Sequence, residues 1–155
     1  MMRKTLTIPT LPTRQALAVA LAAAALGLHG IAHGSEAIYV VVSAQSSIRA
    51  LTQKEVLAVY TGRTRTLPNG DLALPVDQQH EGSARIDFYQ ALTGMDIARI
   101  NSYWARLHFT GQVQPPQSVG DDQAVLQRLR RDPQAIGYLT REPQDPAVRV
   151  VLRLP

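Results

Sequence analysis

The sequence predicts an α/β domain of three layers, in which a mixed β-sheet is flanked by helices. Three observations lead to this prediction. The 155 residues suffice for one domain with a substantial core. Short runs of β-branched and aromatic residues alternate with segments of helical periodicity, which is typical of layered α/β domains. After residue 37 the sequence contains no internal repeat and no linker-like stretch that would divide it.

The first half of the predicted domain contains two strands and a helix. Residues 38–42 form a continuous β-branched and aromatic run, as expected for a strand buried on both faces. Thr52 and Glu55 have the spacing of a capping box, which predicts that a helix begins there. The Asn-Gly pair at 69–70 predicts a tight turn, and residues 72–76 after it are predicted to be a strand.

The second half is predicted to contain three helices and two strands. Apolar residues recur at helical spacing after Asp96, and two consecutive prolines at 115–116 make residues 109–118 irregular. The expected elements are helices at 83–92, from Asp96 onward and at 121–131, and strands at 135–139 and 148–152. The side chains expected in the core include Phe88, Ile100, Trp104 and Leu129.

Residues 1–37 are predicted to be a secretory signal peptide. Basic residues near the start precede the apolar run 16–28, and small residues follow as far as Ala37. The apolar run is shorter than the roughly 20 residues of a membrane-spanning helix. We therefore expect a cleaved, periplasmic chain of residues 38–155 without a membrane span.

The composition excludes several classes of function. The chain has no cysteine, which excludes disulfide scaffolds, thiolate metal sites and thiol catalysis. Three of the 16 basic residues and one of the 12 acidic residues lie before Ile38, so the remaining chain has a net charge of only +2. A chain so close to neutrality has no broad positive field, and we expect no nucleic acid partner.

The loop from Asp77 to Arg85 is the strongest candidate for a binding site. It connects the end of a predicted strand to the start of a helix, where ligands usually bind in open α/β sheets. Gly82 lets a ligand approach the backbone, Ser83 can cap the helix, and the next amides are free to donate. The guanidinium of Arg85 suits a phosphate or carboxylate. In the alternative interpretation, Ser83 only caps the helix and Arg85 pairs with Asp87 or solvent.

Other groups of polar residues give weaker indications of a metal, catalytic or binding site. His80, Glu81 and His108 lack the spacing of a metal site, and Ser83 lacks the flanking pattern of a catalytic nucleophile. We expect no metal, no cofactor and no enzymatic activity. Arg63 and Arg65 are interpreted as surface cations, with contact to a ligand as the alternative.

Ten short motifs occur in the order that is typical of one family, over nearly all of 38–139. They are 51–56 (LTQKEV), 60–63 (YTGR), 67–70 (LPNG), 75–78 (PVDQ), 82–85 (GSAR), 88–89 (FY), 103–104 (YW), 109–111 (FTG), 115–116 (PP) and 135–138 (AIGY). The chain thus resembles the small phosphate-transporter-type substrate-binding proteins. These are related to the periplasmic binding proteins with two α/β lobes, and about 118 residues suffice for a single lobe.

This resemblance implies a site and a function. The anion site of the family falls on Gly82, Ser83, Ala84 and Arg85, and its serine loop falls on Ser46 and Ser47 opposite them. The implied function is binding of a small oxyanion, phosphate foremost, linked to phosphate transport through an inner-membrane transporter or sensor. The alternative is a periplasmic interaction or sensor-type protein that kept the fold but lost the ligand.

Overall fold

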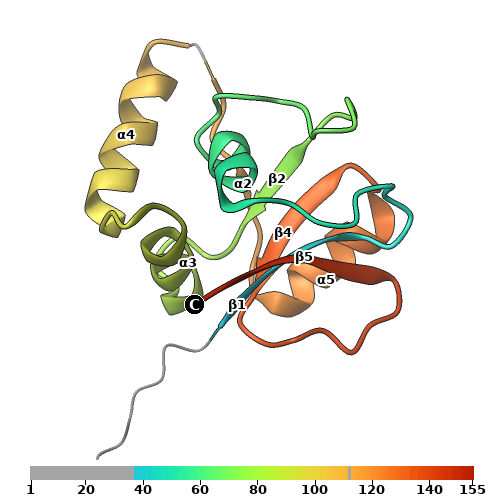
Figure 1. The fold of residues 1–155 in the computed structure, drawn as a ribbon. Helices are drawn as coiled ribbons and strands as arrows, with labels where there is room; N and C mark the ends of the chain where they lie inside the picture. The colour runs from blue at the N-terminus through green and yellow to red at the C-terminus, as the bar shows by residue number, and fades with distance from the viewer. Residues whose placement is uncertain (1–36, 112) are drawn as a thin grey trace, which may run out of the picture. The chain divides into compact units, whose positions relative to one another are not determined.

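A mixed sheet with the strand order β3-β2-β4-β1-β5 organises residues 37–111 and 113–155, which the computed structural model describes (Figure 1). The strands are β1 (Ile38–Ser43), β2 (Leu74–Asp77), β3 (Gln117–Ser118), β4 (Ala135–Leu139) and β5 (Val148–Leu154). The predicted α/β class with a mixed sheet is confirmed. The predicted signal peptide, 1–37, lies outside the described residues except for Ala37.

Strand direction decides which loops meet at each edge of the sheet. β2 runs parallel to β4, whereas β1 runs antiparallel to β4, with Tyr39 opposite Leu139 and Val42 opposite Ile136. The ends of β2 and β4 therefore share one edge with the beginning of β1. The loop that follows β1 leaves from the other edge.

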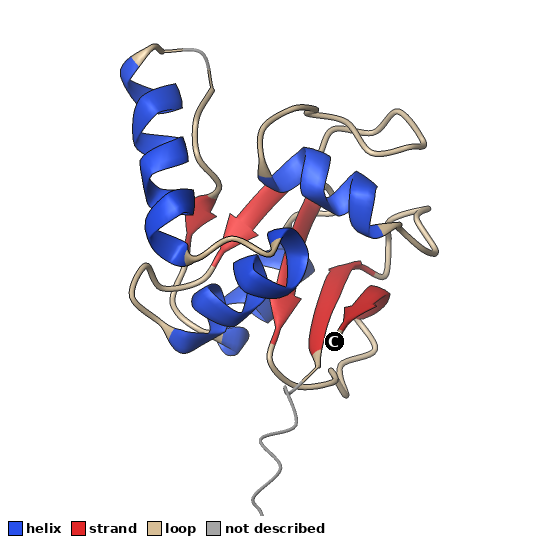
Figure 2. Ribbon diagram, turned by 60° about the vertical axis from the view of Figure 1, so that its left-hand side comes forward, coloured by secondary structure: helices blue, strands red, loops and turns tan. Residues whose placement is uncertain are grey.

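Helices cover both faces of the sheet (Figures 1 and 2). The helices are α2 (Gln53–Tyr60), α3 (Ser83–Thr93), α4 (Ile97–Phe109) and α5 (Asp122–Arg131). Val40 and Val42 lie in the core under α2, α3 and α4, whereas Val41 lies in the core under α5. Successive side chains of a strand point to opposite faces, so the unbroken apolar run of β1 is required by both cores.

Local sequence signals set most helix ends. The hydroxyl of Thr52 accepts from the Glu55 amide, and the Glu55 carboxylate accepts from the Thr52 amide at 2.7 Å, which completes the predicted capping box of α2. Asp96 caps α4 through its side chain. The predicted core residues Phe88, Ile100, Trp104 and Leu129 are all buried.

Two elements differ from the prediction. The short strand β3 lies within the segment 109–118, which was predicted to be irregular, and Figure 2 shows it beside β2 at the edge of the sheet. β2 begins at Leu74 rather than at residue 72, because Leu72 forms an antiparallel bridge with Thr66 instead of pairing with β4. Among the described residues, no helix is both long and apolar enough to span a membrane.

Candidate functional site

A buried polar cluster joins the end of β2 to α3. The carboxylate of Asp77 accepts from the Arg85 Nε at 2.8 Å and from the Tyr89 hydroxyl at 3.1 Å. Its other oxygen accepts from the Tyr138 hydroxyl and from the Gln78 amide. Four donors thus surround one carboxylate, which satisfies the charge that burial would otherwise penalise.

The buried tyrosines in and beside this cluster stay protonated. Burial raises the pKa of Tyr60, Tyr89 and Tyr138 well above the usual 10, and the negative charge of Asp77 acts in the same direction. Tyr60 donates to the carbonyl oxygens of Val76 and Ile136, at 2.9 and 3.0 Å. The hydroxyls therefore serve as fixed donors that connect β2, β4 and the helices.

Arg85 is not the accessible cation that the sequence suggested. Its side chain is 4% exposed, its Nε bonds to Asp77, and its Nη1 donates to the carbonyl oxygen of His80 at 3.3 Å. The guanidinium also lies 5.1 Å from the centre of the Tyr89 ring. The partner of Arg85 is therefore Asp77 and not Asp87, the alternative that the sequence suggested. Its expected role as an anion ligand stays a prediction, but Asp77 already neutralises its charge.

The start of α3 also differs from the prediction. Gly82, not Ser83, is the N-cap residue, and no side chain caps the helix. The Arg85 amide donates to the Gly82 carbonyl oxygen at 3.2 Å. The amides of Ser83 and Ala84 have no acceptor among the described residues, as expected for the first turn of an uncapped helix. The free donors are thus at 83 and 84 rather than at 84 and 85.

These two residues line a hollow of about 530 Å³ between the start of α3, the start of α5 and the loop after β4. Asp122, in the hollow, accepts from the Thr140 hydroxyl at 2.8 Å and from the Gln78 side chain at 2.7 Å. Arg141 also lines the hollow, together with the acidic Asp121 and Glu142. The charge of the described lining is therefore not favourable to an anion, and the donors come mainly from the backbone.

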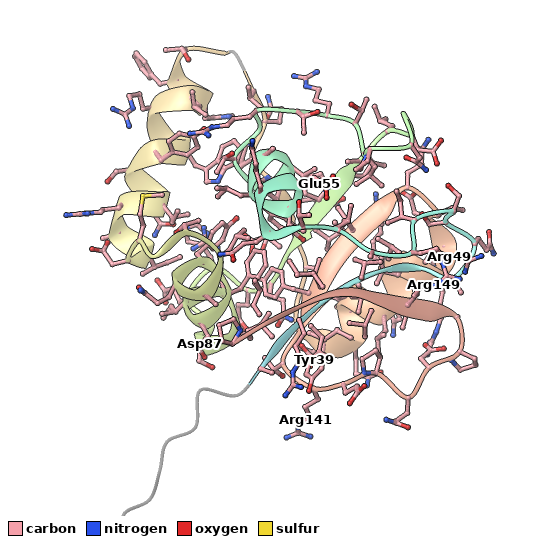
Figure 3. All side chains as sticks on the ribbon, viewed as in Figure 1. Tyr39, Arg49, Glu55, Asp87, Arg141 and Arg149 are labelled. Atoms are coloured by element: carbon pink, nitrogen blue, oxygen red, sulfur yellow. The ribbon has the colours of Figure 1, made fainter. Side chains whose placement is uncertain are left out.

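Ser46 and Ser47 lie at the other edge of the sheet. The Ser46 hydroxyl accepts from the Ile48 amide, and the Ser47 hydroxyl accepts from Asn69, in the turn that precedes β2. Arg149 donates to the Ser46 carbonyl oxygen at 2.9 Å and holds this loop. In Figure 3, Arg149 lies far from Arg141 along the sheet. The expected arrangement with the serine loop opposite Ser83 is contradicted, since β1 runs antiparallel to β4.

The cluster around Asp77 is the part of this site that sequence reasoning missed. The signal available was a carboxylate directly after the apolar residues of a strand, together with a tyrosine within the buried run 135–139. Within the described part of the chain, no three His, Cys, Asp or Glu side chains gather as a metal site would require.

No protein-family model and no curated protein matches the sequence. The solved structures that are similar to it include two proteins of phosphate transport. One is described as a phosphate ABC transporter substrate-binding protein with bound phosphate, from Clostridium perfringens. It has a TM-score of 0.57 and 15% identity, over 76% of this chain and 45% of that chain. The other is an ABC-type phosphate transport receptor from Vibrio cholerae, with a TM-score of 0.58 and 14% identity, over 76% of this chain and 47% of that chain.

The chain has a periplasmic-binding-protein-like fold. The fold expected from the sequence motifs is thereby confirmed. Both neighbours are binding proteins rather than enzymes, and the chain spans less than half the length of either. At these sequence identities the likeness concerns the fold and not the ligand.

Proposed function

We propose that this chain binds a small oxyanion, phosphate foremost, at the amino end of α3. The observation that carries the proposal is the uncapped helix start, where the amides of Ser83 and Ala84 lack acceptors and line an open hollow. Helix amides and the positive end of the helix dipole favour an anion at this position. The description of the Clostridium perfringens structure, with its bound phosphate, supports this choice of ligand.

Each residue has a distinct role in this proposal. The two amides and the Ser83 hydroxyl donate to the anion. Gly82 is the N-cap residue, and a Cβ there would lie 3.2 Å from the Gln79 carbonyl oxygen. Arg85 does not touch the ligand. It positions the loop before α3 by bonding to Asp77 and to the His80 carbonyl oxygen.

We expect weak binding. Arg141 is the one cationic side chain in the described lining of the hollow, and it is outnumbered by the acidic Asp121, Asp122 and Glu142. An anion held by neutral donors in an open hollow keeps part of its hydration shell, which corresponds to dissociation constants of about a micromolar to a millimolar. The signal peptide, the periplasmic location and an inner-membrane transporter or sensor as partner belong to the same proposal.

A specific observation favours a second candidate function. The neutralised Arg85 and the acidic residues in the hollow are also expected of a protein that kept the fold and lost its ligand. Such a chain would act through protein contacts, as a periplasmic interaction or sensor-type protein.

A thermal-shift series separates the two candidates. The chain is heated with phosphate, sulfate, acetate and chloride at matched ionic strength. Binding to the folded state raises the melting temperature by mass action. We expect phosphate to raise the melting temperature more than chloride does. Equal responses to all four anions at tens of millimolar would favour the interaction protein.

A further inference from the structure

A second hollow lies on a different part of the described unit. This groove of about 360 Å³ runs between residues 72–76 and residues 113–117, with Val59 and Trp104 among its lining. It shares no lining residue with the hollow at the start of α3. Its volume is within the range of about 300–1,000 Å³ that is usual for small-molecule sites.

The sequence explains why the groove stays open. β2 and β3 pair in parallel, with Val76 opposite Gln117. One step earlier in this register, Pro75 would stand opposite Pro116. Because proline has no N–H, the ladder cannot continue in that direction. The two segments therefore run on without pairing, and their mostly apolar side chains line the space between them.

The charge of the groove has one sign. Arg65 and Arg128 line it, and no Asp or Glu is among the described lining residues. Arg128 is partly compensated, because its Nη2 donates to Asp132 at 3.1 Å, but its Nε is buried without a hydrogen-bond partner in the described structure. Arg65 is exposed and forms no ion pair with another described residue. The groove thus combines an apolar surface with a positive rim.

From this combination we propose that the groove binds a small organic acid with an apolar body, of the monocarboxylate class. The apolar body lies along the proline and aliphatic side chains beside Trp104, where its removal from water stabilises binding. The carboxylate is bound at the rim by the guanidinium of Arg65. This site is independent of the oxyanion site proposed at α3.

Trp104 makes the proposal directly testable, because it is the only tryptophan of the chain and lines the groove. The experiment is a titration of tryptophan fluorescence with hexanoate, octanoate and decanoate. We expect saturable changes, with a dissociation constant that falls roughly two- to fourfold for each added methylene. We also expect 1-octanol to bind more weakly than octanoate, and 10 mM phosphate not to displace octanoate.

Matched variants test the positive rim and the apolar lining separately. Arg65→Gln is expected to weaken octanoate binding about two- to fivefold, as for an exposed ion pair. Arg63→Gln removes an exposed arginine of the same loop that does not line the groove, and should leave the affinity unchanged. Leu72→Ser removes part of the apolar lining at a half-exposed position and should also weaken binding.

The absence of a saturable fluorescence change with any of the three acids would overturn the proposal. Equal affinity in wild type and Arg65→Gln would overturn it as well, and so would competition by phosphate. Failure of phosphate binding at α3 would leave the octanoate titration unaffected, so the two proposals fail separately.

Discussion

The Nε of Arg85 donates to Oδ2 of Asp77 over 2.8 Å, and the two side chains are only 4% and 6% exposed. This pair ties the end of β2 to the first turn of α3. It also neutralises the one arginine in the first turn of α3. As a consequence, the capacity of this region to hold an anion depends on backbone donors rather than on a side-chain charge.

Removing Asp77 tests how much this buried pair contributes to the stability of the fold. Asp77→Ala leaves the guanidinium of Arg85 buried without its counter-ion and leaves two tyrosine hydroxyls without an acceptor. We expect the free energy of unfolding to fall by about 3–5 kcal/mol, measured by urea denaturation with Trp104 fluorescence.

The matched control for this variant is an exposed ion pair. Arg99 and Asp96 lie 3.7 Å apart with side chains 75% and 64% exposed, so Arg99→Gln should cost less than about 1 kcal/mol. A loss in Asp77→Ala as small as that in Arg99→Gln would contradict the role assigned to the buried cluster.

The buried tyrosines predict a loss of stability in alkali. The pKa values of Tyr60, Tyr89 and Tyr138 are raised in the folded state, chiefly by burial. The unfolded chain loses these protons near pH 10, whereas the folded chain keeps them. The free energy of unfolding should therefore fall above about pH 10, by up to roughly 1.4 kcal/mol per pH unit for each tyrosine.

Absorbance at 295 nm checks this prediction, because it reports tyrosine ionisation. Three of the five tyrosines should ionise only together with the loss of circular dichroism. Complete ionisation near pH 10 in a chain that remains folded would show that these hydroxyls are accessible. Tyr89→Phe should make the decline with pH shallower.

The contact between α5 and β4 depends on a glycine. A Cβ at Gly137 would lie 2.5 Å from Cγ1 of Val125, closer than packed atoms approach. We expect Gly137→Ala to destabilise the fold by about 1–3 kcal/mol, measured by thermal or urea unfolding. At Gly120 the nearest atom would be the Cβ of Ala124 at 3.6 Å, so Gly120→Ala should change stability by less than about 0.5 kcal/mol. Equal effects of the two substitutions would contradict this packing.

Residues 1–37 are predicted to be absent from the exported chain. The basic start, the apolar run and the small residues before Ile38 motivate this prediction. Amino-terminal sequencing of protein recovered from the periplasm should begin near residue 38. An intact Met1 on exported protein would refute it.

Local signals in the sequence predict much of this fold. The run 38–42 and the capping box of Thr52 and Glu55 depend on neighbouring residues only, and both predictions are confirmed. The elements that carry apolar residues at strand or helix spacing were found for the same reason.

The candidate site was harder to predict because it depends on contacts between distant residues. The position of Ser46 far from Ser83 follows from the order and direction of strands that are remote in the sequence. Arg85 and Asp77 are only eight residues apart, but Tyr138, which also donates to Asp77, comes from the distant strand β4. A serine and an arginine at a helix start do not reveal whether another element already satisfies them. The motif alone therefore cannot show which of its side chains are free to bind a ligand.

One of the two amides at the start of α3, that of Ser83, can be removed by substitution. Ser83 is the first helical residue and Gly82 before it is extended, so Ser83→Pro removes an N–H and a hydroxyl at a position where proline suits the helix. Ser83→Ala removes the hydroxyl alone. Ser46→Ala and Ser102→Ala serve as controls away from the hollow at α3.

Calorimetric titration of these variants with phosphate is the most direct test of the oxyanion site. We predict saturable heat in wild type, with a dissociation constant of about a micromolar to a millimolar. Affinity should fall at least about tenfold in Ser83→Pro, fall less in Ser83→Ala, and stay unchanged in both controls. No heat from wild type at tens of millimolar phosphate, or equal affinity in wild type and Ser83→Pro, would contradict an oxyanion site at the start of α3.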